Sequence, residues 1–404
     1  MLPASPASSA VRMRRALGRL RRSAFVESAA TFFALNQRRA RQRLRGRFVR
    51  GIWLRTADYL AAHPDRGTFH PLPVTSYKIP APTFVPDTPA APLGGSIVIH
   101  RHALGFARLT RPWVVGHSGA VIGSDRRLLW DLSYEWPGRP QSHTTYHLPP
   151  LDVPELPGVT FTLAAMAAEK NYFHFLLNSL ARLAYVARLS LPLAPDRYLV
   201  SGEPHAFVLD ALALFGIARD RIVGTAGQPA LRPHTLLAPP LVHHPFVVPR
   251  EVCDFLYQQI VGSRPPPLRR HRLFIDRSDA PTRRIVNLDE LRPAFADFDV
   301  EPLHLTGRSL AEQAALFHDA ELIVANHGAA LANLVFCNPG TRVIQILAPG
   351  MMEREYRAIS HHRDLRHDYL VADFSSPADA RRPRKDRDLI LPPDRLRRAL
   401  AATP

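Results

Sequence analysis

Hydrophobic and polar positions in the last third of the chain alternate between short apolar runs and amphipathic stretches. Residues 272–275 (RLFI), 321–325 (ELIVA) and 342–347 (RVIQIL) are short and mostly apolar, as expected for strands of a parallel sheet covered on both faces. Between the first two runs, Asn287 and Ser309 each precede a glutamate by three positions, which is a signature of helix starts. This order predicts a parallel, Rossmann-like sheet with helices on both faces.

The preceding part of the chain predicts three other kinds of segment. Residues 70–92 are rich in proline, which favours extended chain over helix. Residues 95–147 hold short β-prone runs between Gly and Pro turns, whereas residues 159–249 alternate apolar helices with short strands. SRPPP at residues 263–267 breaks the chain, and we expect a domain boundary there. The predicted units are a basic N-terminal helical extension (1–66), an N-terminal domain made of a β-rich unit and a Rossmann-like half (67–262), and a C-terminal Rossmann-like domain (263–404).

Composition indicates a globular α/β protein with an uneven charge. The chain has 404 residues, of which 46% are hydrophobic, and a formal net charge of +17. Such a charge suits a nucleic-acid, membrane-surface or phosphate-rich partner. However, thirteen arginines lie between Val11 and Arg50 against the single acid Glu27, so much of the excess belongs to the N-terminal extension. We therefore expect no nucleic-acid partner.

The location of the protein is predicted to be cytoplasmic. Cys253 and Cys337 are the only cysteines, and no apolar run reaches the roughly 18 residues that a membrane-spanning helix needs. Two interpretations of the basic extension remain open. It can form an amphipathic helix that inserts Phe25, Phe32 and Phe33 into the inner face of an anionic membrane, or it can be a solvated basic tail.

One apolar helix in the first α/β half carries a polar stripe. At 100° per residue, Asn171, His174, Asn178 and Arg182 fall within about 80° of one another. Such a stripe either lines a cleft or meets polar groups of a neighbouring element. His174 is a candidate general base, because the ordinary pKa of histidine lies near neutral pH; the alternative is a hydrogen-bonded interior histidine.

A second group of polar residues follows the strands of the C-terminal half. Arg277 comes directly after the first strand, and Arg283 and Arg284 lie shortly beyond it. His327 and Gly328 follow the next strand, at the expected start of a helix. Carboxyl ends of parallel strands bind ligands, and arginines and helix N-termini suit phosphate. The alternatives are a structural turn and an arginine cluster that is paired with nearby aspartates.

Three segments, in this order along the chain, resemble the signatures of glycosyltransferase family 61, including bacterial members near capsular polysaccharide genes. They are Glu169–Arg182, FIDRSDAPTRRIVNLDEL (274–291) and ANHGAALANLVFCNPGTRVIQI (325–346), and the resemblance extends over about residues 95–370. It implies a GT-B-like architecture, in which two Rossmann-like domains face a cleft. It also implies a nucleotide diphosphate sugar as donor, a saccharide or glycolipid acceptor, and inversion at the anomeric carbon.

The resemblance assigns expected roles to these residues. The residues expected near the nucleotide diphosphate are Arg277, Arg283, Arg284, Asn326, His327, Gly328, Ala329 and Asn333. Asn171, Asn178 and Arg182 are expected to line the cleft, with His174 as the first candidate base and Glu169 as the second. No metal and no cofactor beyond the nucleotide sugar are expected, because arginines and helix dipoles can stabilise the leaving diphosphate.

The main hypothesis is therefore a hexosyl- or pentosyltransferase in cell-surface or capsular polysaccharide synthesis. The alternative hypothesis is a noncatalytic binder of nucleic acid or anionic polysaccharide. The sequence shows no basic patch interleaved with aromatic residues, which that alternative would favour.

Overall fold

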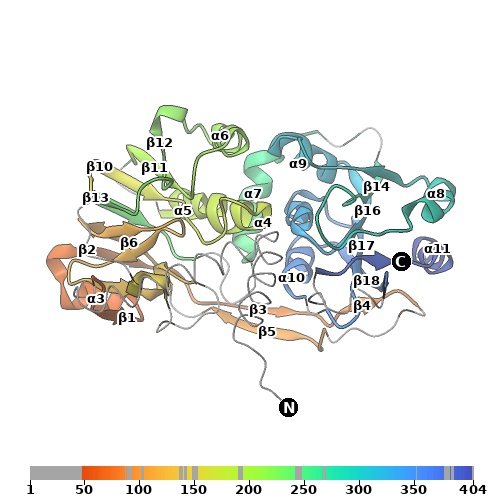
Figure 1. Ribbon diagram of the computed structural model, residues 1–404, viewed down its shortest axis with the longest axis horizontal. Coiled ribbons are helices and arrows are strands. Elements are labelled where there is room, and N and C mark those ends of the chain that lie inside the picture. The colour runs from red at the N-terminus through yellow and green to blue at the C-terminus, as the bar shows by residue number, and fades with distance from the viewer. Residues whose placement is uncertain are drawn as a thin grey trace, which may run out of the picture.

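The chain forms a mixed α/β structure in which two sheets stand side by side (Figure 1). The computed structural model describes residues 48–86, 88, 93–101, 104–135, 140, 143–147, 153–189, 194–241, 248–265, 267, 270–351, 353–376, 383 and 386–402. Residues 1–47, which hold most of the predicted basic extension and its three phenylalanines, lie outside this range. Within the described residues, no helix has the length and apolar character needed to cross a membrane.

The first sheet combines a parallel half with an antiparallel half. Its strands are β1 (Gly51–Trp53), β2 (Gly67–Pro71), β6 (Gly105–Thr110), β7 (Trp113–Val115), β8 (Ala120–Ile122), β9 (Arg127–Leu129), β10 (Glu155–Thr162), β11 (Arg197–Val200), β12 (Ile222–Gly224) and β13 (Ala230–Ala238). Strands β13, β10, β11 and β12 run parallel in that order, and β6 and β7 pair antiparallel with β13. The β-rich stretch therefore continues the Rossmann-like half within one sheet.

The second sheet is parallel throughout, as the apolar runs predict. Its order is β15 (Glu301–Leu303), β14 (His271–Ile275), β16 (Ala320–Asn326), β17 (Arg342–Leu347), β18 (Arg366–Val371) and β4 (Thr83–Phe84). The last five residues of both β16 and β17 are buried without alternation. This burial requires cover on both faces of the sheet, which the surrounding helices provide (Figure 1).

Helices connect the strands and begin close to the predicted positions. The α-helices are α3 (Thr56–Ala62), α4 (Tyr172–His174), α5 (Leu183–Leu189), α6 (Ala206–Ala213), α7 (Arg250–Ile260), α8 (Leu288–Asp297), α9 (Leu310–His318), α10 (Glu355–His362) and α11 (Pro393–Ala401). Ser309 caps α9 in a complete capping box with Glu312, which confirms that prediction. Asn287 stands at the N-cap of α8, but its side chain bonds to Glu290 and Leu391 instead of the backbone of the helix.

Single turns and short pairs of strands complete the described fold. The 3₁₀ turns are η1 (Pro64–Arg66), η2 (Trp130–Leu132), η4 (Thr144–His147), η6 (Leu180–Arg182), η7 (Arg219–Arg221) and η8 (Ala329–Phe336), and η5 (Phe175–Ser179) is a π-helix. The paired strands are β3 (Thr75–Ile79) with β5 (Ile97–Arg101), and β19 (Asp373–Phe374) with β20 (Leu389–Ile390).

Part of the predicted N-terminal domain packs on the second sheet. Strand β4 pairs with β18, and Ile79 and Ile99 of the β3–β5 hairpin pack on Ala358 of α10. Conversely, β1 and α3 lie inside the range predicted for the extension, and β1 pairs with β9. The chain thus passes from the first sheet to the second and back before residue 105, and the predicted domain boundaries stay a prediction.

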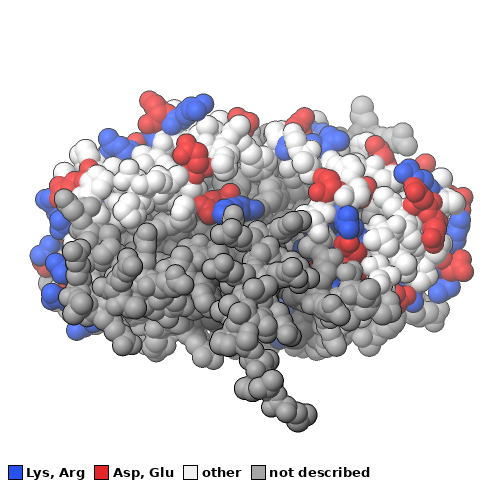
Figure 2. Space-filling view, viewed as in Figure 1, with Lys and Arg blue, Asp and Glu red and all other residues white. Residues whose placement is uncertain are grey.

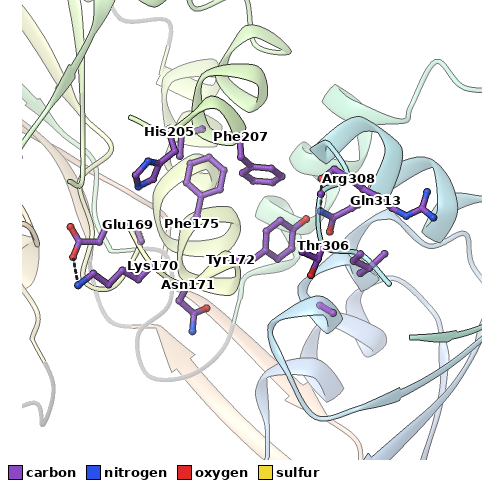
Figure 3. A pocket seen from close by; sticks show the side chains of 15 residues that line it. Glu169, Lys170, Asn171, Tyr172, Phe175, His205, Phe207, Thr306, Arg308 and Gln313 are labelled. Carbon is purple, nitrogen blue, oxygen red and sulfur yellow. Dashed lines mark hydrogen bonds and ion pairs between the residues drawn. The ribbon is translucent and has the colours of Figure 1, made fainter. Parts of the chain in front are cut away.

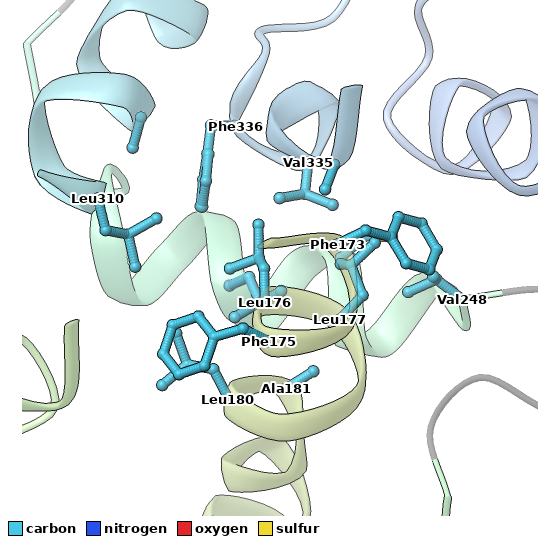
Figure 4. Close-up of a cluster of buried hydrophobic side chains, with 14 of the residues drawn as sticks. Phe173, Phe175, Leu176, Leu177, Leu180, Ala181, Val248, Leu310, Val335 and Phe336 are labelled. Atoms are coloured by element: carbon cyan, nitrogen blue, oxygen red, sulfur yellow. The ribbon is translucent and has the colours of Figure 1, made fainter. Parts of the chain in front are cut away.

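A continuous hydrophobic core joins the two sheets (Figure 4). Leu176 and Leu177 from the first half contact the same cluster as Val335 and Phe336 from the second, and α7 supplies Leu256. All five side chains are fully buried. The two halves are therefore held in one packed arrangement, which fixes the position of the polar residues at their junction.

Candidate active site

The second sheet has a topological switch point at the ends of β14 and β16. The chain leaves β14 for β15 on one side and then continues to β16 on the other side of β14. Loops that depart in opposite directions leave a crevice at the carboxyl ends of such strands, where ligands of open α/β sheets bind. Arg277 follows β14 by two residues and His327 follows β16 directly, so the structure brings both to this crevice.

Arg277 lies directly over the backbone of Gly328. A Cβ at Gly328 would lie 2.3 Å from Nη1 and 2.8 Å from Cζ of Arg277. Because the φ of Gly328 is 177°, which is extended backbone, the glycine is required for space and not for conformation. The Nε of Arg277 is buried without a hydrogen-bond partner, and no described carboxylate forms an ion pair with its guanidinium. Burial, followed by the charge of Arg283, lowers the pKa of Arg277.

Arg283 holds the end of β16 through two hydrogen bonds. Its Nε donates to the carbonyl of His327 (2.9 Å), and its own carbonyl accepts from Nδ2 of Asn326 (2.7 Å). The φ of Arg283 is 57°, a left-handed conformation that costs energy for a residue with a Cβ. Burial lowers the pKa of Arg283. Two desolvated guanidinium groups therefore face one turn, and each lowers the cost of bringing an anion there.

His327 is neutral at this position. Burial, and then the charges of Arg283 and Arg277, lower the pKa of His327 to about 3. Its Nδ1 accepts from Nε2 of Gln345 (3.0 Å), and its ring meets the edge of Tyr356 at 5.3 Å between centroids. The hydroxyl of Tyr356 donates to the carbonyl of Gly328 (2.7 Å). The His327–Gly328 turn is thus fixed on several sides by side chains.

Two residues predicted for the donor site are engaged elsewhere. Arg284 forms an ion pair with Asp388 (Nη2 to Oδ2, 2.6 Å), and its amide bonds to the same carboxylate. Asn333 is fully buried, where it donates to Gln313 and accepts from the hydroxyl of Tyr172. The prediction for Asn333 is corrected by the structure, because its side chain is buried and links the two halves. Arg284 keeps 45% of its side chain exposed, so its predicted role stays a prediction. Ala329 begins η8, so the predicted helix after Gly328 is a 3₁₀ helix.

The predicted polar stripe in the first half is interrupted because the helix changes its type along its length. Asn171 caps α4 through its Oδ1, and the helix then widens into the π turn η5 and tightens into η6. The change from 3.6 residues per turn rotates the later side chains. Arg182 consequently points inward, is 2% exposed and donates to the carbonyl of Ala164 (2.8 Å). The prediction that Arg182 lines a cleft is therefore wrong.

His174 and Asn178 remain together on this segment. Nδ2 of Asn178 lies 2.9 Å from Nδ1 of His174, and burial lowers the pKa of His174. In this arrangement Nδ1 accepts a hydrogen bond and the proton resides on Nε2. Neither ring nitrogen then offers a free lone pair, which makes His174 a poor base in this tautomer.

A cavity of about 360 Å³ opens between the two halves beside α4 (Figure 3). The first half contributes an aromatic group, Tyr172, Phe175 and Phe207, whose neighbouring rings meet edge to face. The second half contributes the loop at 305–308 after β15 and Ala330, two residues beyond Gly328. Predicted residues Glu169 and Asn171 also line the cavity, whereas His174 does not.

Three residues at this junction were not predicted from the sequence. His117, in the turn between β7 and β8, places Nδ1 2.7 Å from Oε2 of Glu169. The sequence Gly-His-Ser-Gly around it is typical of a turn, so it indicated that this histidine is exposed. Tyr356 and Gln345 support His327. Tyr356 lies in an amphipathic helix and Gln345 in an apolar strand, and no local sequence pattern marks either residue. Across the described residues, no three His, Cys, Asp or Glu side chains gather as metal ligands.

One stretch of the chain is similar to a known protein family. The family model described as Glycosyltransferase 61 matches residues 172–344, from α4 through the second sheet to β17. No curated protein matches the chain. The match includes Arg277, Arg283, His327 and Gly328, and the family implies glycosyltransferase activity with a sugar donor and an acceptor. Residues 172–344, about two fifths of the chain, are thus similar to the glycosyltransferase 61 family.

Proposed function

We propose that the protein transfers a sugar, with inversion, from a nucleotide diphosphate sugar to a saccharide or glycolipid acceptor. The observation that carries the proposal is Arg277, whose buried Nε has no partner and whose guanidinium lies over Gly328 at the switch point. Burial lowers the pKa of Arg277 and the charge of Asp279 offsets this only in part. An incompletely paired, desolvated charge is costly, and a diphosphate would supply a direct counterion. In this proposal the two sheets form the halves of a GT-B-like enzyme, with the donor on the second sheet.

The proposed reaction places positive charge where the leaving group develops negative charge. The diphosphate lies between Arg277 and Arg283, and neutral His327 donates a hydrogen bond to it. The acceptor hydroxyl attacks the anomeric carbon from the side opposite the diphosphate, which inverts the configuration. Guanidinium groups already desolvated in the free protein stabilise the departing charge without reorganising, so the site suits the transition state.

We propose Glu169 as the base that accepts the proton of the acceptor hydroxyl. Glu169 lines the cavity between the halves, while His174 does not and has its Nδ1 occupied by Asn178. The imidazole of His117 positions Oε2 of Glu169, which leaves Oε1 with the more distant Lys170 Nζ at 3.8 Å. Two further parts of the proposal come from the family resemblance. They are that no metal takes part and that the protein acts in cell-surface polysaccharide synthesis.

The alternative is a noncatalytic binder of polyanions, for which the described residues on one face of the molecule offer no matching surface. On the face in Figure 2, acidic and basic side chains are interspersed over the described residues. A polyanion-binding surface would gather basic side chains into a stripe. Arg277 instead lies half-buried at the ends of β14 and β16.

The test is nucleotide release from UDP-, GDP- and CMP-linked sugars in the presence of pooled oligosaccharides. We expect release from one UDP- or GDP-linked sugar, loss of at least a hundredfold in Arg277→Ala, and no change in Arg292→Ala. Arg292 is a matched control, because it lies on α8 with 67% of its side chain exposed and pairs with Asp289. Proton NMR of the product gives its anomeric configuration, and retention would contradict the inverting mechanism. Release by wild type and Arg277→Ala at equal rates would contradict the proposed site.

A further inference from the structure

A chain of hydrogen bonds runs from His327 into the interior of the second half. Gln345 on β17 places Nε2 3.0 Å from Nδ1 of His327 and Oε1 3.0 Å from Nε2 of His367 on β18. His367 in turn places Nδ1 2.8 Å from Oγ of Ser360 on α10. Gln345 and Ser360 are buried, so water does not compete for these bonds. We call His327, Gln345, His367 and Ser360 the relay.

The two imidazole rings of the relay are held in place by aromatic contacts. His367 stacks on Tyr369 with 4.7 Å between centroids, and His327 meets the edge of Tyr356. Both tyrosines are anchored through Glu353, which accepts from the hydroxyl of Tyr369 and from the amide of Tyr356. The rings therefore have little freedom to rotate away from Gln345.

The relay has a direction that is set by the orientation of the Gln345 amide. Its carbonyl oxygen Oε1 faces Nε2 of His367 and can only accept, so the proton of neutral His367 is on Nε2, and the hydroxyl of Ser360 then donates to Nδ1. The amide group of Gln345 then donates to Nδ1 of His327, so the proton of His327 is on Nε2. Both histidines are neutral, because burial lowers the pKa of each to about 3.

We propose that Gln345, His367 and Ser360 are positioning residues that hold His327 as a hydrogen-bond donor through Nε2. This inference rests on the proposed function for the identity of the ligand, a nucleoside diphosphate. A fixed N–H next to Arg277 and Arg283 adds a directional donor to two charges, and the bound Nδ1 prevents His327 from acting as a base. The relay thus assigns His327 to the leaving group and leaves proton abstraction to another residue.

The tautomer can be measured directly, without a ligand. Imidazole nitrogen chemical shifts of the full chain labelled with ¹⁵N-histidine distinguish protonated from unprotonated nitrogens, and the spectrum of His327→Asn identifies the signals of His327. We expect Nε2 protonated and Nδ1 unprotonated in the wild type. Protonated Nδ1 would mean that the Gln345 amide is turned by half a rotation and every bond is reversed, which would overturn the proposal.

Two substitutions of Gln345 extend the test to binding. A carboxylate in Gln345→Glu accepts from both histidines, so the proton of His327 should move to Nδ1. Gln345→Leu removes the relay without adding charge and should give a mixture of tautomers. Gln259→Glu, exposed on α7, is the matched control for the added charge.

Affinity for UDP and for GDP, measured by titration calorimetry, is the second readout. We expect Gln345→Glu to weaken whichever nucleotide binds by roughly tenfold to a hundredfold, the range for one hydrogen bond to a charged group. An altered tautomer with unaltered affinity would overturn the positioning role. If neither nucleotide binds the wild type while its Nε2 is protonated, the relay stands and the proposed function fails, so the two outcomes are distinguishable.

Discussion

Replacing Gly328 with alanine separates the binding role of the His327–Gly328 turn from its contribution to folding. The new Cβ would lie 2.3 Å from Nη1 of Arg277, so the guanidinium must retreat by about 1 Å to reach an ordinary contact. Nη1 is the end of a flexible side chain, and the φ of 177° suits any residue. We therefore expect the free energy of unfolding to stay within about 0.5 kcal/mol of wild type.

Binding should respond much more strongly than folding. Moving Arg277 loses hydrogen bonds between a guanidinium and a phosphate, which are together worth about 1.5–3 kcal/mol. That loss corresponds to roughly a tenfold to hundredfold weaker affinity for UDP or GDP, measured by titration calorimetry beside urea unfolding. Gly95→Ala is the control, because a Cβ there meets nothing within 4 Å. Unchanged nucleotide affinity in Gly328→Ala would refute the placement of the diphosphate beside Arg277.

Two further predictions concern stability. The pKa of Glu353 is raised to about 7 by burial and by the charge of Glu355, so the folded state binds this proton more tightly than the unfolded chain. The resulting stabilisation, up to about 3 kcal/mol, is present below the ordinary carboxyl pKa and is lost as pH rises through about 7. Urea unfolding should therefore depend less on pH between about 5 and 8 in Glu353→Gln, and an unchanged slope would contradict this assignment. Tyr172→Phe leaves the buried amide oxygen of Asn333 without its donor and should lower the free energy of unfolding by about 1–3 kcal/mol; a loss below about 0.5 kcal/mol would show that this contact between the halves is dispensable.

The sequence predicted the second sheet well, because its strands are buried on both faces and therefore read as apolar runs. Strands β14, β16 and β17 lie within a residue or two of the predicted runs, and the capping box at Ser309 marks the start of α9. The position of β4 was not predictable in this way. Thr83 and Phe84, in the proline-rich stretch, pair with residues of β18 that lie 285 positions later in the chain. No local sequence pattern indicates such a pairing.

The candidate site was only partly predictable, for reasons of geometry. Arg283 and Arg284 are adjacent, and sequence alone does not tell that the first reaches His327 while the second reaches Asp388. The stripe that included Arg182 assumed a regular α-helix, and the π turn at Phe175–Ser179 changed its direction. His117 and Glu169 are distant in sequence, and the fold of the first sheet brings them together.

The most direct measurement of the central claim is a crystal structure of the chain with UDP or GDP bound. We expect both phosphates at the ends of β14 and β16, within hydrogen-bond distance of the guanidinium of Arg277 and of Nε2 of His327. Phosphates bound at another edge of the molecule, with the guanidinium of Arg277 still unpartnered over Gly328, would contradict it.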